Sequence, residues 1–445
     1  MRSILQRAVP ASLVLIAAIL CSCNVRGAQS AQSPLLNFFE KRVGLIVYIA
    51  PDGNVRVIDQ KGGTSKALTT DAGVRGKVTI AYASPAWSPD GKLVAFTRMT
   101  LDGSSELTDA SLFTAAKDGR HLTRVLSGSR LRPFYLYWSP DSMKVSLLSA
   151  VQGQNILELG LAPAGVEGGY RSLDQGEPLY WDWRADSLSV AAHANTGRPG
   201  TDGERLSLLS LEPDLNRVEM SVDPGLFQAP SFSPDGKSIA YASTSQSVSS
   251  SEMVSTLHLR ALDGSGERTF ATGAGGAFLE FSSDGKRIAY LAASRLQPVP
   301  EGTLTVVNLA AGTKKHTLKE RPVLEFLWAP DGRTLAFVVP DSAGDIDSLF
   351  FQNHDVPHVR LMGYDVRSGK TWVIARFPPS RGFFSVLPFF DQYQRSSTMW
   401  SPDSRFIGFT ALAPDGSAGL FVARADGNIK PRFLTAGDYA FWSWR

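Results

Sequence analysis

The chain has 445 residues, of which 43% are hydrophobic and 20% are charged, an ordinary composition for a globular protein with a large core. Its formal net charge is +3, and this near-neutral balance argues against nucleic acid or an anionic membrane as the main partner. Both cysteines, Cys21 and Cys23, lie close to the N-terminus, so we expect no disulfide in the folded part.

Residues 1–23 are typical of an export signal. Arg2 and Arg7 supply the positive start, and residues 9–20 form an apolar stretch that is too short to span a membrane comfortably. We therefore expect the protein to leave the cytoplasm.

The end of this signal, Leu-Cys-Ser-Cys, resembles a bacterial lipobox. The resemblance implies that Cys23 becomes the acylated N-terminus, although Cys21 departs from the usual pattern. The alternative is a plain signal peptide that is cut near Gly27 or Ala28. Residues 24–42 are polar and rich in small side chains, which predicts a flexible tether.

After residue 43, an aromatic residue followed by a Ser-Pro-Asp-Gly turn, or a variant of that turn, recurs eight times. The aromatic residues are Trp87, Trp138, Trp183, Phe232, Phe281, Trp328, Trp400 and Trp442. Most steps between them are 42 to 51 residues long, and the step from Trp328 to Trp400 is 72. A period of this length indicates one supersecondary unit that is repeated along the chain.

The repeat that begins at Trp87 shows how each unit is expected to fold. Four short apolar runs, residues 86–88, 93–97, 111–115 and 123–126, are separated by turn residues. In the first turn, Pro sets φ, Asp is a good turn former and Gly accepts a positive φ. Four antiparallel strands joined in this way make one propeller blade.

The two ends of the chain complement each other. Residues 439–444 read as a first strand without its partners, whereas residues 44–49, 55–59 and 66–70 read as a second, third and fourth strand. Pairing them closes the ring. We therefore predict an all-β fold, a single β-propeller over residues 43–445 with eight four-stranded blades. The worn turn after Trp183 makes seven blades the alternative.

The repeat resembles the TolB-type propeller repeat. The copy from Phe232 to Gly236, the strand 238–241 and the strand ending at Leu262-Asp263-Gly264 carry the resemblance. TolB proteins have a separate N-terminal α/β domain with no counterpart here, so the resemblance implies the fold rather than TolB's role. Related repeats precede the hydrolase domain of prolyl-oligopeptidase relatives. The chain has no Gly-x-Ser-x-Gly elbow, so we expect no such peptidase activity.

Two insertions in the repeat that begins at Trp328 are the candidate binding site. The first, residues 340–357, leads up to His358, and the second is the exit to the next blade, residues 378–397. Topology places both on one propeller face, where long loops are often functional. The candidate residues for a ligand or partner are Asp345, Asp347, His354, His358, Arg381, Phe383, Phe384, Phe389, Phe390 and Tyr393.

The residues of the two insertions, and the aspartates of the repeated turns, allow other interpretations. The aromatic residues of the second insertion suit a docking surface, or a lid that packs onto the propeller. The acidic and histidine residues match no EF-hand spacing, so we predict no metal. The Asp residues of the repeated turns are turn formers rather than a catalytic ring.

Together these features predict a non-catalytic, monomeric, lipid-anchored protein of the bacterial cell envelope, on its periplasmic or extracellular side. One propeller face would bind a protein or other ligand, with no cofactor and with the lipid as the only membrane contact. One alternative is a propeller lyase that cleaves uronate sugars with histidines and a metal, for which His193, His354 and His358 are candidates. The other is a structural platform in an envelope complex.

Overall fold

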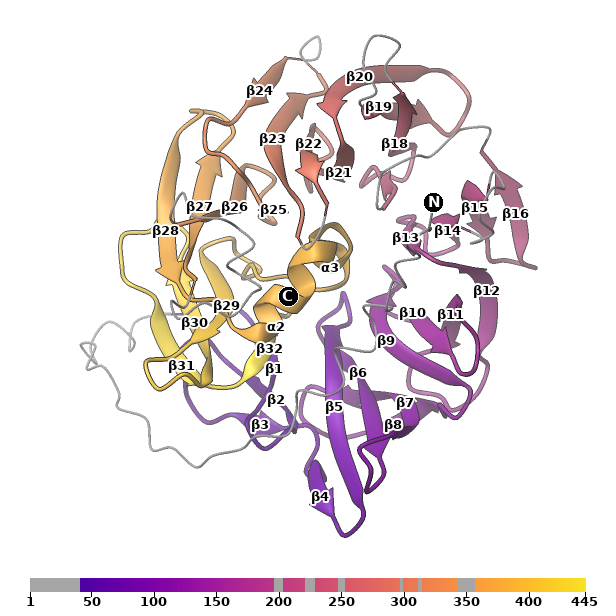
Figure 1. The fold of residues 1–445 in the computed structure, drawn as a ribbon, viewed down its shortest axis with the longest axis vertical. Coiled ribbons are helices and arrows are strands. Elements are labelled where there is room, and N and C mark those ends of the chain that lie inside the picture. Colours follow the sequence, from indigo (N-terminus) through magenta and orange to yellow (C-terminus); the bar gives the residue numbers. More distant parts are fainter. Residues whose placement is uncertain are drawn as a thin grey trace, which may run out of the picture.

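Eight antiparallel sheets stand around a central channel, as Figure 1 shows along the ring axis. This computed structural model describes residues 41–195, 203–220, 229–246, 253–296, 299–310, 314–341 and 357–445. The predicted eight-bladed propeller is therefore confirmed, and the worn turn after Trp183 does belong to a blade.

Blades are numbered along the chain, and the strand that opens each repeat lies nearest the channel; in blade 2 this is β5, because the short β4 lies at the outer end of the blade (Figure 1). Blade 1 consists of β32 (Asp438–Trp442), β1 (Ile46–Ile49), β2 (Val55–Ile58) and β3 (Lys66–Ala67), and blade 2 of β4 (Gly73–Arg75), β5 (Val78–Trp87), β6 (Leu93–Leu101), β7 (Leu107–Ala116) and β8 (Thr123–Leu126). Blade 3 consists of β9 (Leu131–Trp138), β10 (Lys144–Val151), β11 (Leu157–Pro163) and β12 (Arg171–Gly176), and blade 4 of β13 (Leu179–Trp183), β14 (Ser189–Asn195), β15 (Glu204–Ser210) and β16 (Asn216–Glu219).

Blade 5 consists of β17 (Ser231–Phe232), β18 (Ser238–Gln246), β19 (Met253–Ala261) and β20 (Glu267–Ala274), and blade 6 of β21 (Gly276–Phe281), β22 (Arg287–Arg295), β23 (Glu301–Asn308) and β24 (Lys315–Thr317). Blade 7 consists of β25 (Glu325–Trp328), β26 (Thr334–Pro340), β27 (Val359–Asp365) and β28 (Thr371–Phe377), and blade 8 of β29 (Phe406–Leu412), β30 (Ala418–Arg424) and β31 (Arg432–Ala436). In blade 8 the innermost strand is reduced to the bridge between Trp400 and Ile407.

Ring closure follows the prediction. β32 pairs antiparallel with β1, so that Trp442 lies opposite Ile46 and Phe441 opposite Val47. The backbone amide of Ser443 also donates to the carbonyl of Leu45 at 2.7 Å. The last strand of the chain thus completes the first blade, and the two ends hold each other in place.

The repeated turns connect neighbouring blades as well as strands. In three of them Ser142, Ser187 and Ser404 replace the glycine and take a φ of 60 to 64°, which is strained for a residue with a side chain. Each of these serine hydroxyls accepts a hydrogen bond from the turn aspartate amide of the preceding blade, at 3.0 Å from Asp90, 2.9 Å from Asp141 and 3.0 Å from Asp331. This bond between blades offsets the strain.

The repeated tryptophans join blades from the inside. The indole Nε1 of Trp138 donates to the carbonyl of Ala86 at 3.0 Å, and that of Trp87 donates to Phe441 at 3.2 Å. Trp328 and Trp400 make the same bond to Glu280 and Leu327. In each case the acceptor is the residue just before the aromatic residue of the preceding blade. The aromatic position of the repeat is therefore both core and connector.

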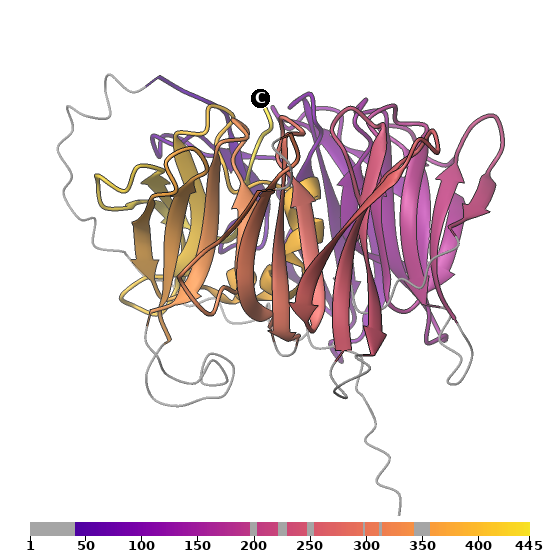
Figure 2. The ribbon, with the colours of Figure 1, turned by 90° about the horizontal axis from the view of Figure 1, so that it is seen from above.

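The second insertion is helical, which the sequence did not lead us to expect. It forms α2 (Arg381–Val386), the 3₁₀ turn η3 (Leu387–Phe389) and α3 (Phe390–Ser396). Figures 1 and 2 show these elements within the ring, in the central channel, rather than spread over a face. We call them the plug.

Candidate functional site

The sequence-predicted site residues divide into three groups. Asp345, Asp347 and His354 lie outside the described residues. His358, Arg381 and Phe389 are exposed, on the edge of β27 and on the plug. The other aromatic residues of the second insertion face the ring, with Phe383 and Phe390 buried and Phe384 and Tyr393 half-buried.

The plug is anchored by its first turn and by its aromatic residues. Ser380 caps α2, accepting from the Phe383 amide at 3.1 Å, and Asp438 of β32 accepts from the Gly382 amide at 2.9 Å. Phe390 packs edge-on against Phe326 of β25, with ring centroids 5.1 Å apart. Phe383 and Phe390 therefore pack as core, as the lid alternative expects, whereas Phe389 stays exposed.

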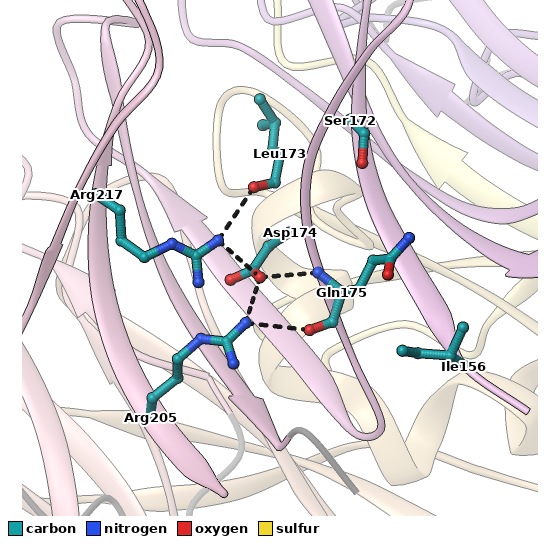
Figure 3. Close-up of a pocket in the computed structure, with 7 residues that line it drawn as sticks. All are labelled: Ile156, Ser172, Leu173, Asp174, Gln175, Arg205 and Arg217. Atoms are coloured by element: carbon teal, nitrogen blue, oxygen red, sulfur yellow. Dashed lines mark hydrogen bonds and ion pairs between the residues drawn. The ribbon is translucent and has the colours of Figure 1, made fainter.

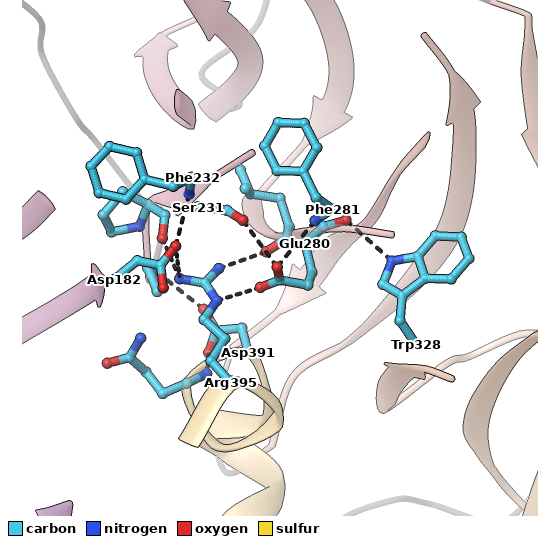
Figure 4. Close-up of polar contacts among 12 residues, drawn as sticks. Asp182, Ser231, Phe232, Glu280, Phe281, Trp328, Asp391 and Arg395 are labelled. Atoms are coloured by element: carbon cyan, nitrogen blue, oxygen red, sulfur yellow. Dashed lines mark hydrogen bonds and ion pairs between the residues drawn. The ribbon is translucent and has the colours of Figure 1, made fainter. Parts of the chain in front are cut away.

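A buried arginine pins the far end of the plug to three blades. The side chain of Arg395 on α3 is 4% exposed and pairs with Glu280 of blade 6. It lies 3.9 Å from Asp182 of blade 4 and donates to the carbonyls of Pro230 and Leu279 (Figure 4). A buried charge of this kind is tolerated only when it is paired and hydrogen-bonded, as it is here.

The acceptors of this cluster are themselves held in place. Asp182 accepts from the Tyr137 hydroxyl at 2.9 Å and from the Phe232 amide at 2.7 Å, and Glu280 accepts from the Ser231 hydroxyl at 3.0 Å. Tyr137, Asp182, Ser231 and Glu280 each come just before the aromatic residue of blades 3 to 6. Consecutive blades thus present a polar arc at one repeat position, and this arc binds Arg395.

Burial dominates the electrostatics of the channel. It raises the pKa of Glu280 to about 7, with Asp182 adding to the rise and Arg395 opposing it, and it raises the pKa of Asp391 to about 6. Glu325 of β25 is 2% exposed, and burial alone raises its pKa to about 8. Its Oε1 has no hydrogen-bond partner within the described part of the chain.

The groups around Arg395 contribute to holding the plug. Glu280, Asp182 and Asp391 neutralise Arg395, and Gln392 donates to the carbonyl of Trp181 at 2.9 Å. His193 in β14 and His358 beside β27 belong to blades 4 and 7, which are not neighbours. Among the described residues, no three His, Cys, Asp or Glu side chains are grouped to hold a metal ion.

A second candidate lies on the face that carries the repeated turns. The residue that follows the turn glycine or serine is a cation in five blades: Lys92, Lys237, Lys286, Arg333 and Arg405. In the adjacent blades 3 and 4 it is instead Met143 and Leu188, which are 65% and 47% exposed. Apolar side chains replace solvated cations at two neighbouring positions.

The outer turns of blades 2, 3 and 4 carry further exposed apolar residues. They are Leu122, Val166 and Leu215, and with Met143 and Leu188 they form a surface that we call the apolar arc. Backbone bonds connect the turns that carry these residues: the amide of Ala164 donates to the carbonyl of Met143, that of Leu211 to Leu188, and that of Gly168 in blade 3 to Val125 in blade 2. Exposed apolar residues that gather in this way mark interaction sites more often than single ones do.

The apolar arc was not predicted from the sequence, because it lies in short turns and not in long insertions. The signal was present in the repeat, since aligning the turns shows Met and Leu where the other blades carry Lys or Arg. The polar residues that surround Arg395 likewise become visible only when the repeats are aligned with one another. Four consecutive repeats then show a polar residue just before the aromatic position.

A third candidate is a hollow at the outer rim between blades 3 and 4 (Figure 3). Its polar wall is formed by Asp174 and Gln175 of β12, Arg205 of β15 and Arg217 of β16. Ile156 and Leu173 form its apolar part. This hollow could not be predicted from the sequence, because its hydrogen bonds join β12 to β15 and β16 across 30 or more residues.

No protein-family model and no curated protein matches the chain. Among solved structures, it is similar to a putative TolB from Agrobacterium tumefaciens at 16% identity, covering 86% of this chain and 99% of that one with a TM-score of 0.39. It is also similar to the propeller domain of the trilobed protease from Pyrococcus furiosus at 13% identity, covering 80% and 98% with a TM-score of 0.48. A structure described as oligogalacturonate lyase in complex with manganese matches at 14% identity, covering 86% and 97% with a TM-score of 0.43.

These neighbours include TolB-like and other propeller proteins. At such identities they say nothing about activity. In the described part of the chain, no helix has the length and apolar character needed to cross a membrane.

Proposed function

We propose that this chain is a non-catalytic, lipid-anchored protein of the cell envelope that docks another protein through the apolar arc. The observation that carries the proposal is the change from Lys or Arg to Met143 and Leu188 in two adjacent turns. The fully buried core of a protein interface is more apolar than the rest of the surface, and Met is enriched there. The rest of the ring then serves as a rigid support.

The position of the chain ends supports this face. Gly44 packs against Pro402 in the turn of blade 8, and the C-terminal carbonyl of Arg445 lies beside Gly91 in the turn of blade 2. The folded part therefore begins on the same face as the apolar arc. If Cys23 is acylated, the tether of residues 24–42 leads from this face to the bilayer. A partner held at the same membrane would meet the arc.

The neighbouring side chains suggest the chemistry of that partner. Lys92 of blade 2 and Lys237 of blade 5 occupy the turns on either side of Met143 and Leu188, and the side chain of Lys92 is 76% exposed. A partner that presents apolar side chains with carboxylates at their edge would complement this pattern.

The test uses a substitution that the fold already accepts elsewhere. Met143→Lys and Leu188→Lys together give blades 3 and 4 the residue type that the other turns carry, so the variant is expected to fold normally. A photo-crosslinking residue at Val166, in cells of the source organism, is expected to give one discrete adduct that the double variant abolishes. Lys286→Gln, the same turn position outside the arc, serves as the control and should leave the adduct unchanged.

Two results would contradict the proposal. An adduct that persists in the double variant would show that the arc does not carry the binding. Adducts to lipid alone would replace the protein partner with the bilayer surface.

A further inference from the structure

The hollow between blades 3 and 4 holds two arginines around a single buried carboxylate. The side chain of Asp174 is 2% exposed. Nη2 of Arg205 pairs with its Oδ1, and Nη2 of Arg217 lies 2.9 Å from the same oxygen. Figure 3 shows both side chains reaching from blade 4 to this one aspartate on blade 3.

The two guanidinium groups use only part of their hydrogen-bonding capacity in these contacts. Nη2 of Arg205 also donates to the carbonyl of Gln175 at 3.2 Å, and Nη2 of Arg217 donates to that of Leu173 at 3.3 Å. The buried Nε of Arg205 has no partner within the described residues, and neither has Oδ2 of Asp174. A guanidinium carries five N–H donors, so donors remain for a ligand.

The charges in the hollow do not balance. Two guanidinium groups face one carboxylate, and the other lining residues, Ile156, Ser172, Leu173 and Gln175, are neutral. Glu158, which lies opposite Gln175 on β11, does not line the hollow, and its carboxylate accepts from the Tyr170 hydroxyl at 2.5 Å and from the Gln175 side-chain amide at 2.7 Å. The arginine side chains are only 19% and 31% exposed, so their surplus charge is partly shielded from water.

We propose that this hollow is a binding site for the carboxylate of a small molecule. A carboxylate matches the planar fork of arginine, and such charge-assisted pairs are stronger than neutral hydrogen bonds. Ile156 and Leu173 would contact the carbon skeleton, and the Ser172 hydroxyl would bond a polar substituent. The site shares no residue with the apolar arc and does not depend on the function proposed for it.

The experiment is calorimetric titration of the full-length protein at constant ionic strength. The probes are D-glucuronate, N-acetylglycine and inorganic phosphate, with D-glucose as the neutral counterpart of glucuronate. We expect at least one carboxylate to bind, glucose not to bind, and phosphate to bind no more tightly than the carboxylate.

Three variants assign the binding to this hollow. Arg217→Gln removes one cation from a half-exposed side chain and is expected to weaken carboxylate binding about tenfold or more. Arg124→Gln, an exposed arginine of β8 paired with Glu167, is the matched control and should change nothing. Asp174→Asn removes the internal anion that competes for the arginines, so it is expected to strengthen binding, an effect that a purely structural role would not produce.

Several outcomes would overturn the proposal: no binding of either carboxylate, equal binding of glucose and glucuronate, or unchanged affinity in Arg217→Gln. Tighter binding of phosphate would overturn the assignment to a carboxylate. If Asp174→Asn does not fold, Arg217→Lys decides in its place, since retaining the charge without the fork should give an affinity between those of the wild type and Arg217→Gln.

Discussion

Glu325 gives the structure its sharpest pH dependence. It lies at the start of β25, beside the plug, and burial raises its pKa from 4.5 to about 8. The folded state therefore holds this carboxyl neutral at pH 7, whereas the unfolded chain ionises it above pH 4.5. Because the unfolded state loses its proton first, the free energy of unfolding falls as the pH rises from about 4.5 to about 8 and then levels off.

The magnitude follows from the two pKa values. With a pKa of 4.5 unfolded and about 8 folded, the cost of keeping Glu325 neutral is about 1 kcal/mol at pH 5 and about 4 kcal/mol at pH 8. Glu325→Gln has nearly the same shape and no charge to lose. Relative to the wild type, the variant should therefore gain about 3 kcal/mol of stability between pH 5 and pH 8, on top of any constant offset from the amide.

The assay is urea unfolding of wild type and variant at several pH values from 5 to 8. Taking the difference between the two proteins cancels the titration of all groups that they share. Glu219→Gln, an exposed residue of β16, is the control and should follow the wild type within about 0.5 kcal/mol at every pH. A difference between Glu325→Gln and wild type that does not change with pH would refute a buried neutral carboxyl at this position.

The other predictions concern the plug, the connections between blades and ring closure. Arg395→Met should destabilise the fold by about 3–5 kcal/mol, because it leaves Glu280 and Asp182 buried without their cation, whereas Arg424→Met on the surface should have little effect in the same urea assay. Trp138→Phe removes the bond to Ala86 and should cost about 2 kcal/mol by thermal unfolding; a change below about 0.5 kcal/mol would argue against the connector role. Ser404→Ala keeps the strained φ but loses the bond to Asp331, so it should cost about 1 kcal/mol more than Ser404→Gly, and equal costs would refute the compensation. Deleting residues 438–445 should abolish cooperative unfolding followed by circular dichroism, because it removes the innermost strand of blade 1; an unchanged transition would show that the closing strand is dispensable.

The propeller was predictable because its signal is repeated. Each Ser-Pro-Asp-Gly turn marks a strand boundary, and the seven other copies in register outweigh the worn copy after Trp183. Closure by β32 followed from counting strands at the two ends. These inferences need only local turn chemistry and the rule that a strand must pair.

The plug was not predictable by the same means. α2 and α3 have six and seven residues, too few to show a helical period, and the partners of Arg395 come from three other parts of the chain. The aromatic residues from Phe383 to Tyr393 were recognised as unusual, but composition alone does not distinguish a docking surface from a core. Long-range packing in the channel decides between the two.

The apolar arc could be predicted from the sequence in part. Met143 and Leu188 stand at a repeat position whose usual residue is known from the other blades, so their departure was visible in the sequence. That the position is exposed, and that Val166 and Leu122 lie nearby, required the fold. A comparison of repeats within one chain therefore gives part of the information that a family alignment would give.

The most direct test of the account is to compare the two faces of the ring by photo-crosslinking in intact cells. Reporters at Leu122, Val166 and Leu215 sample the apolar arc, and reporters at His358 and Arg381 sample the insertion that the sequence first indicated. If the apolar arc is the docking surface, its three positions should give the same discrete protein adduct and the other two should give none. An adduct formed only from His358 or Arg381 would contradict it and would place the binding surface on the insertion of blade 7.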